Sequence, residues 1–136
     1  MLVCTGLTCC GGEGNTSSNE PETLTLVEDV RVSFCDQRMR EKLTHEDISS
    51  VTYFGYDTDN FCYVLRFNFN EEGKTKLQTF TTNNKGTQVY LFINEEPAAM
   101  PLIMAEITDG RCAITFENEH LAKRYFNMLT QKSDPQ

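Results

Sequence analysis

The carboxy-terminal part of the chain reads Gly110-Arg-Cys-Ala-Ile-Thr-Phe-Glu-Asn-Glu-His-Leu-Ala-Lys-Arg-Tyr-Phe-Asn-Met-Leu-Thr-Gln131. It begins with the alternation of a β-strand, in which every second residue from 112 to 116 is apolar. The spacing then becomes helical, and the apolar positions are Leu121, Ala122, Tyr125, Met128 and Leu129. Asn118 precedes them and is a suitable N-cap, because its side-chain oxygen can accept a backbone N–H of the first turn. The stretch therefore predicts a strand that runs directly into one amphipathic helix.

Most of the preceding chain shows strand patterns separated by turn residues. Residues 24–34 alternate and predict one long strand, or two with a break near 28–29. Further strands are predicted at 49–55, 61–69, 76–82, 88–93 and 102–107. Polar turns are predicted at 36–42, 57–60, 71–73 and 83–86, and residues 44–47 resemble a capping box around a single helical turn.

The last predicted turn is the dipeptide Asp109-Gly110, a hairpin signal that would join residues 102–107 to 112–116. The total is about seven antiparallel strands followed by one convincing helix. Because strands and helices do not alternate, a parallel sheet is not predicted. The expected fold class is mainly β, with antiparallel strands and a carboxy-terminal α-helix.

The length and charge of the chain restrict its class. A chain of 136 residues suits one domain, predicted at 23–132, with polar tails at 1–22 and 133–136. A net charge of −8 argues against a nucleic-acid partner, which requires clustered positive charge. The chain contains no apolar run close to the length of a membrane-spanning helix, so a cytoplasmic protein is expected.

The six cysteines are not expected to form a disulfide framework, because the amino terminus lacks the pattern of a secretory signal. Cys35, Cys62 and Cys112 fall in or beside strand-like runs, where a reduced cysteine behaves as a small hydrophobic residue. The other three, at positions 4, 9 and 10, lack the spacing of zinc ligands. They are read as incidental thiols of a tail, with palmitoylation of Cys9 and Cys10 as the alternative.

Catalytic motifs are missing from the sequence. It contains no glycine-rich phosphate loop, no Gly-x-Ser-x-Gly and no His-Glu-x-x-His. His45 and His120 are predicted in a turn and on the polar face of the helix, and their spacing from Cys62 does not indicate a nucleophile and base. The prediction is a protein that is not an enzyme, with no catalytic residues, no metal and no cofactor.

Residues 45–65 read His45-Glu-Asp-Ile-Ser-Ser-Val-Thr-Tyr-Phe-Gly-Tyr-Asp-Thr-Asp-Asn-Phe-Cys-Tyr-Val-Leu65 and resemble the central hairpin of phosphotyrosine-binding (PTB) domains. Residues 32–42 are similar to the preceding strand and turn of that family, and residues 116–129 to its closing helix. The resemblance implies a pleckstrin-homology-like barrel or sandwich capped by the final helix. Residues 70–104 depart from the family pattern, with more strand and no clear second helix, and are closer to the insulin-receptor-substrate branch.

PTB domains bind an extended peptide as an added strand on a sheet edge, against the final helix. The resemblance thus implies an adaptor or scaffold domain in signalling, with a peptide groove between an edge strand and residues 119–131. Phe126 lies at the rim of the apolar helix face and matches the groove phenylalanine of the family best. The candidate peptide-binding residues are Phe126, Arg124, Tyr125, Leu129, Arg111 and Arg66. Tyr125 and Leu129 also fit the core, and the three arginines do not form an evident phosphotyrosine pocket.

Two further expectations concern partners. Phosphoinositide binding is disfavoured because such sites need clusters of Lys and Arg, whereas an open edge strand permits a homodimer. The alternative function is a small ligand-binding or enzymatic protein with a curved sheet, similar to cystatins or nuclear transport factors. In that case the aromatic strand at 61–69 would line a pocket.

Overall fold

The computed structural model describes residues 22–59 and 61–131, which form two four-stranded antiparallel sheets and two α-helices. The front sheet has the strand order β1 (Glu22–Leu24), β4 (Ile48–Asp57), β5 (Cys62–Phe69) and β8 (Arg111–Phe116). The back sheet has the order β3 (Glu41–Thr44), β2 (Val32–Cys35), β6 (Tyr90–Ile93) and β7 (Glu96–Ala99). The predicted mainly-β class with a carboxy-terminal helix is confirmed, as a sandwich rather than a closed barrel.

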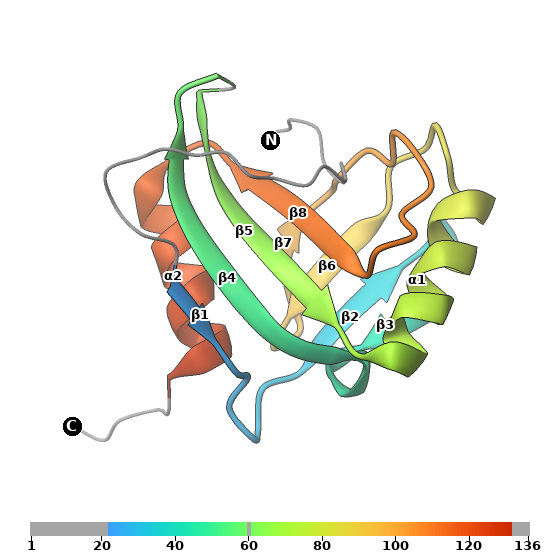
Figure 1. The fold of residues 1–136 in the computed structure, drawn as a ribbon, viewed down its shortest axis with the longest axis horizontal. Helices are drawn as coiled ribbons and strands as arrows, with labels where there is room; N and C mark the ends of the chain where they lie inside the picture. Colours follow the sequence, from blue (N-terminus) through green and yellow to red (C-terminus); the bar gives the residue numbers. More distant parts are fainter. Residues whose placement is uncertain (1–21, 60, 132–136) are drawn as a thin grey trace.

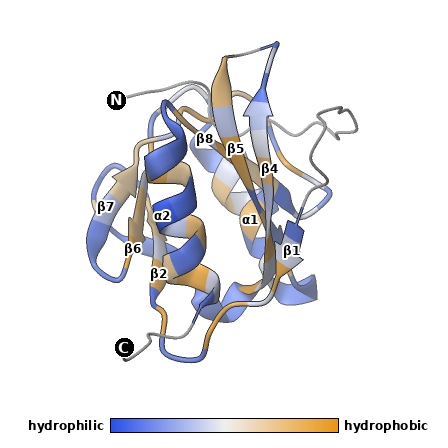
Figure 2. Cartoon of the chain, turned by 90° about the vertical axis from the view of Figure 1, so that its left-hand side faces the viewer, coloured by the Kyte–Doolittle hydropathy of each residue, from blue (hydrophilic) through white to orange (hydrophobic). Residues whose placement is uncertain are grey.

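The two helices lie at opposite sides of the sandwich (Figure 1). Helix α2 (Glu119–Thr130) lies beside β1 and β4, and α1 (Glu71–Asn83) lies at the other side, near β3. Figure 2 shows α2 between the sheets, with β6 and β7 on one side of it and β4 and β1 on the other. The core fills the space between the inner faces, where Phe34 meets Phe67 at a ring-centroid distance of 5.6 Å. Neither α1 nor α2, the helices of the described residues, covers the outer face of the front sheet.

The predicted hairpin of β4 and β5 is present. Leu65 and Phe67 are fully buried, so the alternation read from the sequence assigns the inner face correctly. The turn is closed by Asp57, whose carboxylate accepts the N–H of Asp59 at 2.9 Å. Phe61 follows the turn at a positive φ of 57° and is 74% exposed, so the first aromatic of the predicted strand lies outside the core.

Residues 24–34 do not form a continuous strand. Their two ends are β1 and β2, which belong to different sheets, and residues 25–31 cross between the sheets. In this crossing the N–H of Val27 donates to the carbonyl of Leu129 in α2, at 2.9 Å. The alternative of two strands with a break near 28–29 is thus correct. The alternation of apolar residues did not predict that the two strands belong to different sheets.

The strand predicted at 76–82 is wrong, because these residues belong to α1. The helix begins at Asn70, whose side chain accepts the N–H of Gly73 at 2.8 Å. Its buried positions, Gly73, Leu77, Phe80 and Thr81, recur at helical spacing. The expectation of a single helix is therefore also wrong, and the polar residues 71–73 form the first turn of α1 rather than a hairpin.

The strand predicted at 102–107 and its hairpin at Asp109-Gly110 are also wrong. Apart from isolated bridge positions at Leu102, which pairs with Gln88, and Ile103, residues 100–110 form an irregular connection. Ile107 is buried, and its N–H donates to the hydroxyl of Thr81 in α1 rather than to a strand. Gly110 does adopt a positive φ of 77°, but in a turn that leads into β8.

Several local predictions are confirmed. The capping box around residues 44–47 forms a 3₁₀ turn, η1 (His45–Asp47), and Asn118 caps α2 through the N–H of Leu121. The turn after β2 is held by Asp36, whose carboxylate accepts two backbone N–H groups of the turn. These bonds lower the pKa of Asp36, the bond from the N–H of Arg40 most of all.

Cys35, Cys62 and Cys112, the cysteines of the described residues, are all buried. The predicted tails, with their cysteines at 4, 9 and 10, lie outside the described residues, except that residue 22 already belongs to β1. Neither α1 nor α2, the helices of the described part, has the length and hydrophobicity to cross a membrane.

Candidate functional site

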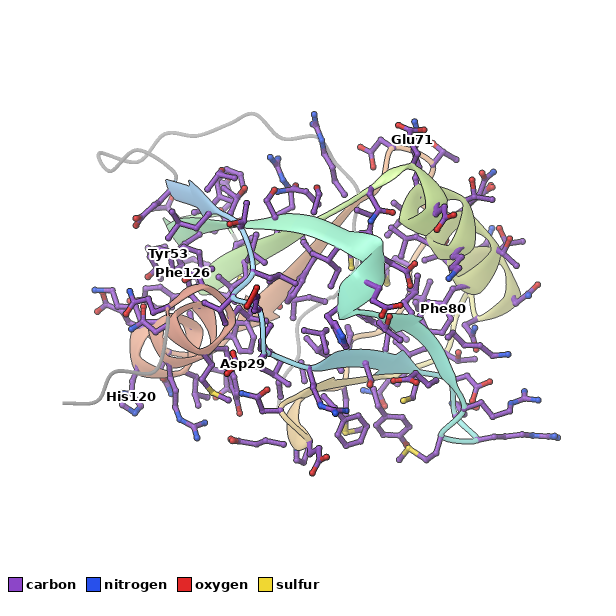
Figure 3. All side chains as sticks on the ribbon, turned by 90° about the horizontal axis from the view of Figure 1, so that it is seen from below. Asp29, Tyr53, Glu71, Phe80, His120 and Phe126 are labelled. Atoms are coloured by element: carbon purple, nitrogen blue, oxygen red, sulfur yellow. The ribbon has the colours of Figure 1, made fainter. Side chains whose placement is uncertain are left out.

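Phe126, the residue expected at the rim of a peptide groove, lies in the core. Its side chain is 5% exposed and stacks on Tyr53 of β4 at a centroid distance of 5.5 Å. Figure 3 shows the two rings next to each other where α2 meets the front sheet. Leu129, one helical turn further on, is fully buried. Phe126 therefore packs α2 against the front sheet, and Leu129 belongs to the core.

Arg124 and Tyr125 connect α2 to β7 of the back sheet through Glu96. The carboxylate of Glu96 accepts hydrogen bonds from both terminal nitrogens of Arg124, at 2.6 and 3.0 Å, and from the hydroxyl of Tyr125 at 2.8 Å. The bonds from Arg124 and then Tyr125 lower the pKa of Glu96. These contacts occupy Arg124 and bridge the space between α2 and β7.

The two other candidate arginines, Arg66 and Arg111, lie together on the outer face of the front sheet. Arg66 of β5 is opposite Ala113 of β8, and Arg111 is opposite Asn68. The outer face is formed by Thr23, Ser50, Thr52, Phe54, Asp57, Cys62, Val64, Arg66, Asn68, Arg111, Ala113 and Thr115. The structure thus brings two of the three predicted arginines to one surface and separates Arg124 from them.

Asn68 organises this outer face. Its amide oxygen accepts the Nε–H of Arg66 at 3.0 Å, and its amide nitrogen donates to the hydroxyls of Ser50 and Thr52 at 2.9 and 3.1 Å. The guanidinium of Arg66 also lies over the ring of Phe54, 4.9 Å from its centroid. Arg66 is therefore held in one orientation. Asn68 was not a candidate from the sequence. It contacts Arg66 because the two side chains share one face of β5, and it reaches Ser50 and Thr52 because β4 pairs with β5 in this register.

Strand β8 is an edge of the front sheet. The N–H of Phe69 donates to the carbonyl of Gly110, which sets the phase of the ladder between β5 and β8. In this phase the residues paired through hydrogen bonds are 112, 114 and 116, so the backbone groups of Ala113 and Thr115 point away from β5. No other strand of the described part pairs with β8 on that side.

The other three edges of the described sheets are poorer templates for an added strand. β1 has only three residues, and β3 begins with the exposed charges of Glu41 and Lys42. β7 contains Pro97, which has no N–H to donate. β8 has six residues and no proline, so it is the least protected edge among the described residues.

The outer face of the back sheet contains a shallow hollow of about 370 Å³. Its lining is Arg31, Val32, Ser33, Cys35, Glu41, His45, Phe92 and Glu95. Ser33 donates its hydroxyl to Glu41 at 2.5 Å, and the Nδ1 atom of His45 faces the N–H of Val32 at 3.4 Å. None of the aromatics of residues 61–69 lines it, and Phe67 and Phe69 pack against Phe34 in the core instead.

The cysteines and histidines of the described strands and helices lie in different surroundings. Cys62 is 2% exposed, and burial, followed by Glu41 and Asp36, raises the pKa of the Cys35 thiol. The raised pKa of Cys35 favours its neutral thiol over the nucleophilic thiolate. His45 belongs to η1, and His120 is exposed in the first turn of α2.

No known family model matches the chain, and no curated protein matches it. Among solved structures it is similar to SecDF in a super-membrane-facing form, with a TM-score of 0.55 and 18% identity over 69% of this chain and 12% of that one. It is also similar to a structure of SecDF described as a membrane component that enhances protein export, with a TM-score of 0.55 and 19% identity over 68% of this chain and 43% of that one. The chain thus spans less than half of either protein, and such similarity concerns the fold alone. The resemblance to PTB domains stays a prediction.

Proposed function

We propose that this chain is a non-enzymatic protein-interaction domain, of the adaptor or scaffold kind, that takes an extended segment of a partner as an added strand on β8. The observation that carries the proposal is the unpaired edge of β8, which directs the backbone groups of Ala113 and Thr115 outward. In this mode of recognition, backbone hydrogen bonds supply affinity and alternate side chains supply selectivity.

The proposed site keeps part of the groove predicted from the sequence. β8 ends at Phe116, and α2 begins at Glu119, so the edge and the first turn of the helix are adjacent in the chain. Phe126 and Leu129 have no role in this site because both are buried in the core. Arg111 and Arg66 lie on the sheet face beside the edge and are the candidate contacts that the proposal retains.

The backbone alone gives weak binding. An added strand forms about four hydrogen bonds with the N–H and C=O groups of Ala113 and Thr115, and each contributes about 0.5–1.5 kcal/mol. Association costs about 4–15 kcal/mol of translational and rotational freedom. Side-chain contacts beside the edge must therefore supply the rest, so the partner is selected there.

The test uses Ala113→Pro, which removes the outward N–H of residue 113 without removing a donor to β5. The matched control is Ala113→Ser, which keeps that N–H and enlarges the side chain by only one hydroxyl. Peptides selected from a random display library on the wild-type chain are measured against both variants. Hydrogen exchange at the amides of residues 113 and 115 then locates the bound peptide.

The proposal is supported if bound peptides protect these two amides and lose at least about tenfold in affinity, or about 1.4 kcal/mol, with Ala113→Pro but not with Ala113→Ser. It is overturned if no peptide is selected, or if the selected peptides bind Ala113→Pro as tightly as the wild type. Sedimentation of the chain alone tests a homodimer. If Ala113→Pro abolishes a wild-type dimer, a second copy occupies the edge.

A further inference from the structure

We infer that the segment bound by β8 is acidic, with carboxylate side chains that meet Arg111 and Arg66 on the outer face of the front sheet. This inference rests on the proposed function and names the chemical class of its partner. Side chains alternate along a strand, so only every second side chain of an added strand lies on the outer face beside these arginines.

The register assigns these positions. The side chain opposite Ala113 shares the outer face with it and lies diagonally beside Arg111, about 7–8 Å away between backbone positions. Arg66 is on the other side of Ala113, about 10 Å from the added strand, or two strand spacings. Because the side chain of Ala113 is one methyl group, a long acidic side chain can pass over it toward the guanidinium of Arg66.

The charges of the outer face favour an anion. The chain has 20 acidic residues and 12 basic ones, yet the register of the described strands places two arginines and one carboxylate on the outer face. That carboxylate belongs to Asp57, opposite Cys62 at the end of β5 away from Arg111. The nearest carboxylates along β8 are at its two ends, at Asp109 and Glu117, and Asp109 accepts the backbone N–H of Arg111. Charges elsewhere on the surface are screened over about 8–10 Å at moderate salt, so this local excess of positive charge decides the preference.

The two arginines are suited to carboxylates in different ways. Arg66 is oriented by the amide of Asn68 and by the ring of Phe54, so it loses less side-chain freedom on binding. Arg111 is exposed and forms no ion pair with a described residue. A guanidinium binds a carboxylate through two parallel hydrogen bonds, which adds selectivity for acidic over amide side chains.

A second copy of the chain does not fit this surface. Its β8 would present Arg111, Ala113 and Thr115 on the outer face, and so it would add a positive charge and no carboxylate. Like charges on neighbouring strands are unfavourable. The partner is therefore an acidic segment of another protein rather than β8 of a second copy.

The experiment uses the edge-binding peptides obtained in the test above. Each Glu or Asp of a selected peptide is replaced by Gln or Asn, and the affinities are measured at low and high salt. On the protein side, Arg111→Gln and Arg66→Gln are compared with Arg38→Gln, which removes the same charge from the exposed turn after β2. Thermal melting shows whether each variant is folded. If Arg66→Gln unfolds, the affinities of Arg111→Gln and of the substituted peptides test the inference instead.

The expected result is an excess of acidic residues at alternate peptide positions. Replacing one of them, or Arg111, should weaken binding by about threefold to tenfold at low salt and by less at high salt, while Arg38→Gln should have no effect. Edge-binding peptides without acidic preference, or equal affinity for wild type and Arg111→Gln, would overturn this inference and leave the edge function standing. If no selected peptide protects the amides of residues 113 and 115, the proposed function itself is refuted, and the inference about acidic partners is refuted with it.

Discussion

The substitution Gly73→Ala tests how closely α1 packs on the loop before β4. A Cβ atom at position 73 would overlap the carbonyl oxygen of Asp47 and lie 2.8 Å from its Cβ, whereas ordinary contacts begin near 3.4 Å. The same carbonyl accepts the N–H of Asn70 at 2.9 Å, and the Asp47 carboxylate pairs with Lys76 at 3.1 Å. The helix must therefore move away from Asp47, and these contacts must stretch or break.

The magnitude follows from three contributions. Overpacking of a buried site costs about 1–3 kcal/mol. Loss of the hydrogen bond between Asn70 and Asp47 costs about 0.5–1.5 kcal/mol. Replacing glycine by alanine in a helix stabilises the folded state by about 0.5–1 kcal/mol, which offsets part of this loss. Gly73→Ala should thus lower the free energy of unfolding by about 0.5–4 kcal/mol, or the melting temperature by about 2–16 °C for a domain of this size.

Urea unfolding followed by circular dichroism measures this change, since a shifted midpoint with an unchanged slope reports stability. The control is Thr75→Ala in the same helix, which is exposed and should leave stability equal or slightly higher. If Gly73→Ala unfolds at the wild-type midpoint or above it, the close approach of α1 to Asp47 is refuted.

Three further predictions concern buried contacts and pH. Thr81→Val should lower the free energy of unfolding by about 1–3 kcal/mol, because it leaves the buried N–H of Ile107 without an acceptor. Hydrogen exchange of that amide should be faster in Thr81→Val but not in Thr81→Ser, which keeps the hydroxyl, and equal exchange in both variants would contradict this role. Phe126→Ala should cost about 3–5 kcal/mol in urea unfolding, since it removes a core ring that stacks on Tyr53, and a loss below about 1 kcal/mol would contradict its burial. The lowered pKa of Asp36 stabilises the fold above about pH 4, where the unfolded carboxyl is ionised, and this stability is lost as pH falls through the folded pKa. Asp36→Asn should therefore be less stable than wild type at neutral pH and lose less stability between pH 4 and 2, whereas parallel curves would contradict this role.

The strands and helix with a strong single period were predictable from the sequence. β5 alternates over its whole length, and α2 has both an N-cap and a continuous apolar stripe. α1 was missed because its residues 75–82 are rich in threonine, which is common in strands, and only Leu77 and Phe80 mark its apolar face. The N-cap Asn70 was the local signal that would have corrected the prediction.

The candidate site was less predictable because it depends on contacts between distant segments. The helical period places Phe126 at the rim of the apolar stripe, but the ring of Tyr53 covers it from a strand more than 70 residues earlier in the chain. Likewise, no local pattern places Arg66 beside β8, since this depends on which strand pairs with β5. Edge strands are defined by missing neighbours, which a single sequence does not reveal.

Each sheet combines strands that lie far apart in the sequence, and this affects folding during synthesis on the ribosome. The front sheet takes β1 from one end of the described chain and β8 from the other, and the back sheet combines two hairpins separated by β4, β5 and α1. Until residues 111–130 emerge, β5 keeps an open edge and Tyr53 lacks its cover from α2. At about 5–20 residues per second these last elements take about 1–4 s to synthesise. During this interval the nascent chain exposes an aromatic strand edge, the kind of surface that chaperones bind and that aggregates when they do not.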